Sequence, residues 1–197
     1  MNRNVKSLVV LLCVVALILL PLTTEASSKT LTQNTNLYNG NAWVTFKGGT
    51  TAILRANGHV AEGVLAQNTN LYNGNAWVTF MASHSASFRE NGHVVRGVLA
   101  HNTNLYNGNA WVTFMVGQGA EFRSNGHIES GVLAQNTNLY NGNAWVTFMA
   151  GQGVTFRTNG HIESGVLAQQ TNLYTGKAWK TYSAGTRVYF NEKGHVQ

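Results

Sequence analysis

The sequence predicts an all-β protein, an elongated and β-solenoid-like repeat of β-hairpins. Three observations support this fold class. The segment NTNLYNGNAWVTF begins at Asn34 and recurs unchanged at Asn68, Asn102 and Asn136. Asn-Gly pairs, which favour hairpin turns, recur at spacings that alternate between 18 and 16 residues. No stretch beyond residue 26 has the apolar period of an amphipathic helix, so strands and turns account for that part of the chain.

The repeat has a period of 34 residues, which predicts five units within a single domain, 27–197. Such a period is typical of repeat proteins in which each unit buries its apolar face on its neighbours. The fifth copy, QTNLYTGKAWKTY, carries Thr175, Lys177 and Lys180 in place of two Asn and one Val. We therefore expect this unit to cap the array and to oppose end-to-end association. The predicted units are 31–64, 65–98, 99–132, 133–166 and 167–197.

Each unit contains two predicted hairpins, one at each Asn-Gly pair or its counterpart. In the first unit the pairs are Asn39-Gly40 and Asn57-Gly58. We expect type I′ turns there, because both residues of an Asn-Gly pair accept positive φ. The flanking segments alternate between apolar and polar residues, as in VTFR at 154–157. This period of two is typical of strands that bury one face.

Two other arrangements fit the same repeat. A five-bladed propeller has the matching number of units and four strands per unit, although its blades commonly run about 40 residues or more. A parallel β-solenoid would place the Asn-Gly pairs at its corners. The divergent fifth unit favours an open end over a closed ring, so we predict the open stack of antiparallel hairpins.

The first 26 residues have the features of a signal peptide. Arg3 and Lys6 give a positive start, residues 8–20 form an unbroken apolar run, and Thr24 and Ala26 suit a cleavage site. The run is short for a membrane-spanning helix, which needs about 20 apolar residues, so an uncleaved N-terminal anchor is the alternative. We predict export to the bacterial periplasm, the cell surface or the extracellular space, with membrane contact through this segment alone.

The composition argues against several classes of function. The chain has no aspartate, which calcium-binding loops and Ser-His-Asp catalytic sites use. Its only cysteine, Cys13, lies in the predicted signal peptide, so we expect no disulfide in the exported domain. Reactive residue types are spread evenly, so we predict that the protein is not an enzyme and needs no cofactor. The net charge of +6 is modest, which together with export argues against a nucleic-acid partner.

Two segments, FRENGHVVRGVL and YFNEKGHVQ, carry an aromatic residue, a turn and then an apolar strand. In this pattern the chain resembles MORN-type repeats and the choline-binding type of cell-wall-binding hairpin repeat. The resemblance implies a surface or envelope binding module and covers one hairpin of each unit. The Tyr-x-Gly signature of MORN repeats is not a regular feature, and Gly97-Val98 replaces the Gly-Trp of the choline-binding repeats. No aromatic cage is therefore carried over from that family.

A histidine follows the second turn of every unit. Alternation places its apolar neighbour inward and the imidazole outward. A row of imidazoles could bind metal or respond to pH, but units about 10 Å apart or more could not share one ion. We favour polar residues at the start of an exposed strand and keep a metal site as the alternative. These histidines are His59, His93, His127, His161 and His195.

The tryptophans are the candidate ligand-binding residues. In NAWVTF, alternation puts Val44 and Phe46 on one face and Trp43 and Thr45 on the other. If the first pair belongs to the core, the tryptophans form an exposed row. Aromatic rings stack on sugar rings while amides and hydroxyls bind sugar hydroxyls. The alternative is a structural role in a second core. The row consists of Trp43, Trp77, Trp111, Trp145 and Trp179.

These patterns predict an exported cell-envelope or secreted repeat protein that acts as a binding or scaffolding module. Its expected partner is a cell-wall glycan or polysaccharide, contacted through the tryptophan row, or another envelope protein. Repetition of a weak site would add avidity on a polymer. The alternative is a purely structural or self-assembling repeat protein with no small ligand. Only the binding module requires exposed tryptophans.

Overall fold

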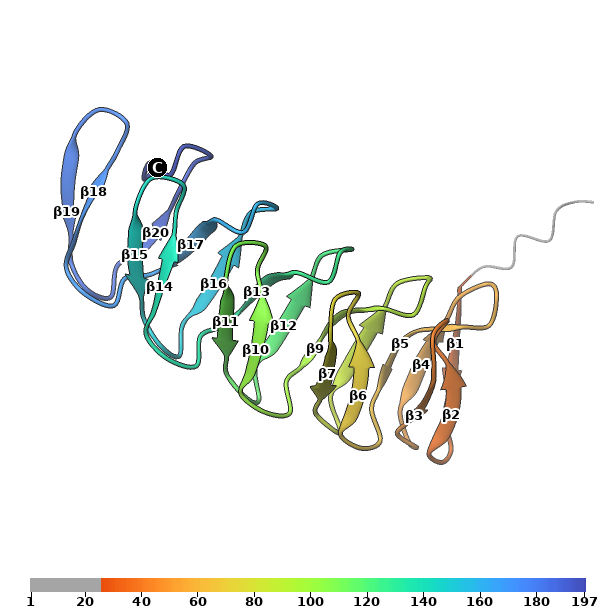
Figure 1. Cartoon of the computed structure of the whole chain (residues 1–197). Coiled ribbons are helices and arrows are strands. Elements are labelled where there is room, and N and C mark those ends of the chain that lie inside the picture. The colour runs from red at the N-terminus through yellow and green to blue at the C-terminus, as the bar shows by residue number, and fades with distance from the viewer. Residues whose placement is uncertain (1–25) are drawn as a thin grey trace, which may run out of the picture.

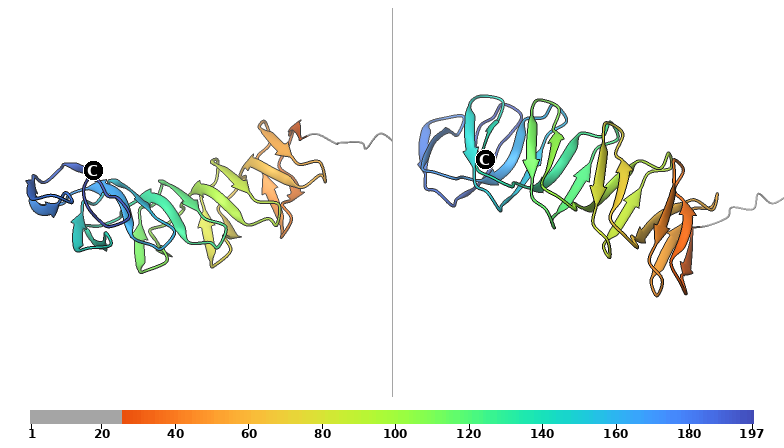
Figure 2. Two further views of the ribbon diagram at one scale, coloured as in Figure 1. Left: turned by 90° about the horizontal axis from the view of Figure 1, so that it is seen from above. Right: turned by 60° about the horizontal axis from the view of Figure 1, so that its bottom comes forward.

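The computed structural model of the chain describes residues 26–197, which form twenty strands and no helix. The molecule is elongated, with a long sheet on one side and a row of hairpins on the other (Figure 1). Two further views show the same two layers along the whole length (Figure 2). The predicted all-β, elongated hairpin repeat is confirmed. The predicted signal peptide, 1–26, lies outside the described residues except for Ala26, which directly precedes the first strand.

Ten strands form one continuous sheet in the order β1-β4-β5-β8-β9-β12-β13-β16-β17-β20. Every pair in it is antiparallel and the sheet is open at both ends, which excludes the parallel solenoid and the propeller. The bounds are β1 Ser27–Thr30, β4 Thr51–Leu54, β5 Val60–Val64, β8 Ser85–Phe88, β9 Val94–Val98, β12 Gly119–Phe122, β13 Ile128–Val132, β16 Gly153–Phe156, β17 Ile162–Val166 and β20 Arg187–Tyr189.

The other ten strands form five separate two-stranded hairpins that cover one face of this sheet. Each of the first four predicted units therefore supplies one covering hairpin and then two strands to the sheet, whereas the fifth supplies one covering hairpin and β20, and β1 precedes the first unit. The covering hairpins are β2 Thr35–Tyr38 with β3 Trp43–Phe46, β6 Thr69–Tyr72 with β7 Trp77–Phe80, β10 Thr103–Tyr106 with β11 Trp111–Phe114, β14 Thr137–Tyr140 with β15 Trp145–Phe148, and β18 Thr171–Tyr174 with β19 Trp179–Tyr182.

The predicted hairpins form, but the predicted type I′ turns are wrong. Type I′ needs positive φ at both central residues, and no Asn among the described residues has it. In the covering hairpin, the Asn39 side-chain oxygen accepts the N–H groups of Asn41 and Ala42 at 2.8 Å each. This side chain closes the turn in place of a second backbone bond.

The turn between two sheet strands is built differently. Gly58 donates its N–H to the Arg55 carbonyl at 2.8 Å and has φ of 80°. A three-residue loop of this kind combines a type I turn with a glycine bulge. The strand register shifts beside it, between Ile53 and Leu54. Asn-Gly therefore predicted the positions of the turns correctly, while two different side-chain and backbone arrangements stabilise them.

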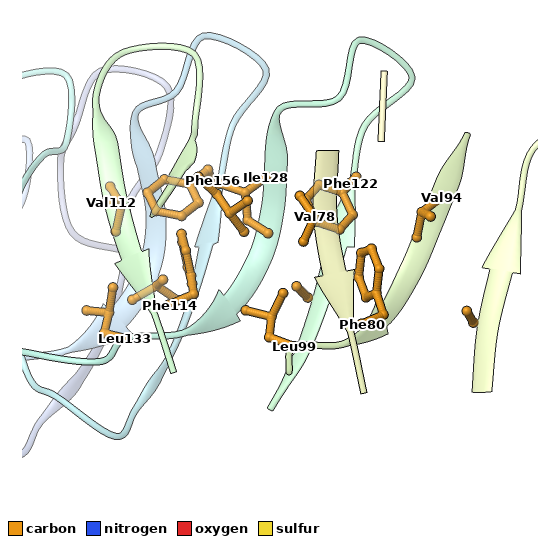
Figure 3. Close-up of a cluster of buried hydrophobic side chains, with 14 of the residues drawn as sticks. Val78, Phe80, Val94, Leu99, Val112, Phe114, Phe122, Ile128, Leu133 and Phe156 are labelled. Carbon is orange, nitrogen blue, oxygen red and sulfur yellow. The ribbon is translucent and has the colours of Figure 1, made fainter. Parts of the chain in front are cut away.

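The core lies between the covering hairpins and the sheet. Figure 3 shows part of this core, where Phe80 and Phe114 of two successive covering hairpins lie close to the sheet residues Phe122 and Phe156, respectively. These side chains are at most 1 % exposed. Burial of a side chain of this size stabilises by roughly 1.5–3 kcal/mol, and the same contacts recur in every unit. The chain thus forms one continuous core along its length.

Neighbouring units are joined across this core by aromatic contacts. The Phe on the second strand of a covering hairpin meets a sheet Phe of the next unit edge to face, with ring centroids 6.1–6.3 Å apart. Such pairs contribute about 0.5–1.5 kcal/mol beyond their burial. The pairs are Phe46–Phe88, Phe80–Phe122, Phe114–Phe156 and Phe148–Phe190.

Polar contacts join the same units at the turns. The Arg89 guanidinium donates to the carbonyl of Phe122 at 2.7 Å, and Arg55, Arg123 and Arg157 bond the next unit in the same way. A buried Asn in the covering turn also donates to a glycine carbonyl of the next unit, at 3.0–3.1 Å. These pairs are Asn39–Gly92, Asn73–Gly126 and Asn141–Gly194.

Candidate functional site

The register of the covering hairpins decides which residues face outward. Tyr38 pairs with Trp43 and Asn36 pairs with Thr45, so these four side chains share one face of the first hairpin. The opposite face carries Val44 and Phe46, which are 2 % and 0 % exposed. The core therefore fixes the outward direction of the other four side chains. We call each outward set of Tyr, Trp, Asn and Thr an aromatic tile.

The tryptophans are the most exposed large apolar side chains of the described chain. Trp43 is 72 % exposed, and the other four lie between 58 % and 60 %. The positions agree with the alternation in NAWVTF, and the second-core alternative does not hold. Because the five hairpins lie along one side of the sheet, the tiles form a row on that side (Figure 1).

A tyrosine beside each tryptophan was not identified from the sequence as a site residue. Its ring centroid lies 5.4–5.5 Å from the Trp centroid, with the two planes tilted by 45–52°. The signal was present in TNLY, where an inward Leu places the next residue outward. These residues are Tyr38, Tyr72, Tyr106, Tyr140 and Tyr174.

The histidines occupy a different place from the one predicted. Each is half-buried with its ring edge-on to the Tyr ring of the same unit, with centroids 4.9–5.0 Å apart. His59 lies just before β5, and its N–H donates to Asn57 Oδ1 at 3.0 Å. The His59 ring therefore packs against the Tyr38 ring of the aromatic tile, and His59 is not an exposed strand residue. Within residues 26–197, no three His, Cys, Asp or Glu side chains are grouped to hold a metal ion.

The polar half of each tile is suited to hydrogen bonding. In the first hairpin the Thr45 hydroxyl donates to the Asn36 side-chain carbonyl at 2.5 Å. This bond leaves the Asn amide N–H groups and the lone pairs of the Thr oxygen available to a ligand. A tile therefore offers two aromatic rings and a pair of polar groups side by side. This combination suits a ring that has an apolar face and hydroxyls at its edge.

In residues 26–197 there is no helix with the length and hydropathy needed to cross a membrane. Comparison of the chain with protein-family models, with curated proteins and with solved structures finds no match. The site is therefore defined by its own geometry: five aromatic tiles in a row, each with an exposed tryptophan, a tyrosine against it and a histidine behind the tyrosine.

Proposed function

We propose that the protein is an exported binding module of the cell envelope whose aromatic tiles contact a glycan polymer. The observation that carries the proposal is the exposure of all five tryptophans on equivalent outward positions. A tryptophan in water contributes little to the core, because the stabilisation comes from apolar area removed from solvent. The Phe contacts and the hydrogen bonds of the turns stabilise the fold, so fold stability does not explain why the tryptophans are present at these positions.

A polymer is the favoured ligand because the tile is repeated. One ring stacked on one sugar gives weak binding, on the order of a few kcal/mol at most. Once the first tile is occupied, binding at the next becomes intramolecular, and overall affinity rises by orders of magnitude. Short, soluble sugars should therefore bind far more weakly than long chains or insoluble polysaccharide.

A binding assay on insoluble polysaccharides tests the proposal. Purified protein is sedimented with cell-wall sacculi, chitin and cellulose, and the bound fraction is measured. We expect retention on at least one polymer. The triple variant Trp77→Ala, Trp111→Ala and Trp145→Ala should lose at least tenfold in affinity while its thermal unfolding is unchanged. Quenching of tryptophan emission by the same polymer in soluble form provides a second readout.

Tyr189→Ala is the matched control, because Tyr189 is an aromatic residue, 52 % exposed, on the other face of the sheet. It should bind as the unaltered protein does. Equal retention of the triple variant and the unaltered protein would rule out the tryptophan row as the site. Failure of every polymer to retain the unaltered protein would leave the purely structural role as the better explanation.

A further inference from the structure

The last unit differs from the others at the surface that faces the next unit. In units 1–4 this surface buries a Val and a Phe of the covering hairpin; in unit 5 the same positions are Lys180 and Tyr182. Lys180 is exposed, whereas Val146 of the fourth unit is 2 % exposed. The Lys180 ammonium lies 5.3 Å from the centroid of the Tyr182 ring. The apolar contact surface of the repeat is thus replaced by a charge and a hydroxyl.

The polar connections to a following unit are also replaced in unit 5. Thr175 occupies the position of Asn39, Asn73 and Asn141, and its hydroxyl bonds within its own turn, to Ala178. Asn191 occupies the position of the Arg residues that bond the next unit, and its side chain bonds the N–H of Lys193. The Asn and Arg side chains that bond the next unit in the earlier units are therefore both replaced in unit 5, and the replacements bond within unit 5.

An open hollow marks the place where a further unit would dock. It has a volume of ≈ 490 Å³ and is lined by Gly176, Asn191, Glu192, Lys193 and His195 of unit 5. In earlier units the equivalent glycine faces the next unit's turn: a Cβ on Gly74 would lie 3.2 Å from Gly126 N. Around Gly176 only His195 is within 4 Å.

The first strand carries a second obstacle at the opposite end of the array. β1 pairs with β4 in the same register that β5 uses with β8, so Lys29 stands where β5 has Gly63. A Cβ on Gly63 would lie 2.6 Å from the Phe46 ring. A lysine at this position leaves no room for the ring of a hairpin stacked above it. Both ends of the array therefore carry a lysine where the inner units have a small or apolar residue, Lys29 in place of Gly63 and Lys180 in place of Val146.

We propose that the residues at the two ends act as paired stops that prevent one copy of this chain from stacking on another. The two end surfaces are otherwise complementary, since the units share one interface and β1 occupies the position of an inner strand. Docking a second copy would bury Lys180 and force Lys29 against Tyr182. Burying an unpaired ammonium costs several kcal/mol, which exceeds the gain from one Phe-sized contact.

The test restores the repeat residues at each end separately. The C-end variant combines Thr175→Asn, Lys180→Val, Tyr182→Phe and Asn191→Arg, and the N-end variant is Lys29→Gly. We expect the unaltered protein and each single-end variant to sediment as monomers at all concentrations. A chain restored at both ends should form oligomers whose average mass rises with concentration. An equal mixture of the two single-end variants should stop at a dimer.

Lys47→Val is the control for loss of an exposed lysine elsewhere, and it should remain monomeric. A reduced C-end variant, Lys180→Val with Tyr182→Phe, covers the case in which the fourfold change fails to fold. Self-association of the unaltered protein would overturn the proposal, as would a monomeric doubly restored chain. Oligomers of the C-end variant alone would indicate nonspecific self-association and not end-to-end stacking, and this result would also overturn the proposal.

Discussion

A glycine in every second inner strand of the sheet, β5, β9, β13 and β17, provides the space for a phenylalanine. A Cβ on Gly97 would lie 2.5 Å from Cδ1 of Phe80, and Gly63, Gly131 and Gly165 stand in the same relation to their own Phe. None of these glycines has a positive φ. Their role is steric, because the missing side chain is what lets the covering hairpin approach the sheet.

Gly97→Ala should destabilise the protein by about 1–3 kcal/mol, because the added methyl group overpacks a core that contains no space for it. Gly119→Ala is the control: this strand glycine also lacks a positive φ, but its Cβ would meet no atom within 4 Å. Urea unfolding followed by circular dichroism measures both. Equal stability of the two variants would contradict the assigned packing.

The tile could be predicted at the residue scale only in part. Alternation alone places Trp43 outward, since its neighbours Val44 and Phe46 are the more apolar pair. The pairing of Tyr38 with Trp43 depends on hairpin register, and a type I′ turn at Asn39-Gly40 would have paired Tyr38 with Asn41 instead. The position of His59 against Tyr38 depends on contact between two hairpins of one unit, which no local pattern encodes.

At the scale of single elements, the two kinds of turn have different roles. The turn of a covering hairpin reaches the next unit through a buried Asn, as Asn73 does with Gly126. The turn between sheet strands presents an exposed Asn, such as Asn91, that bonds His93 locally. The Asn side chain thus connects units in the covering turn and closes only its own loop in the sheet turn, where the glycine carbonyl accepts the bond from the neighbouring unit.

Asn73→Ala should cost about 1–3 kcal/mol, because it leaves the Gly126 carbonyl and two turn N–H groups without their partner. Asn91→Ala should cost less than about 1 kcal/mol, since water can replace its amide at the exposed turn. Thermal unfolding of the two variants side by side measures the difference. A larger loss for Asn91→Ala would mean that the covering turns do not connect the units.

The individual strands and turns were predicted better than the way they assemble, because the assembly depends on these connections between units. Strand segments and turn positions follow from period-two patterns within about ten residues. The division into a continuous sheet and separate covering hairpins depends on contacts such as Arg89 with Phe122, 33 residues apart. Every unit contains both hairpins with similar patterns, so the sequence did not indicate which would join the sheet.

At the scale of the whole molecule, each unit contacts chiefly its neighbours along the array. Stability in such an array is close to a sum over units and interfaces, and no unit is unique except at the ends. The fourth unit bonds the fifth in the way that the first bonds the second. Any interior unit should therefore be dispensable for folding.

Deletion of residues 99–132 should give a folded four-unit protein, because it joins Val98 to Leu133 and so recreates the native Val-Leu junction. We expect a β-sheet circular dichroism spectrum, a lower denaturation midpoint and weaker retention on polysaccharide, with one tile fewer. An equally long deletion that cuts across units, 108–141, keeps the period and is the control for the choice of boundary. An unfolded product of both deletions would show that the array is not modular.

The near-identical interfaces between units also have a genetic consequence. Stretches of coding sequence that specify the same thirteen residues four times can mispair during replication or recombination, and each event adds or removes a whole 34-residue unit in frame. The product remains foldable, because the new junction matches the old ones, and the terminal unit still closes the array. Length variants that differ by whole units are therefore the form of variation that this architecture tolerates most readily.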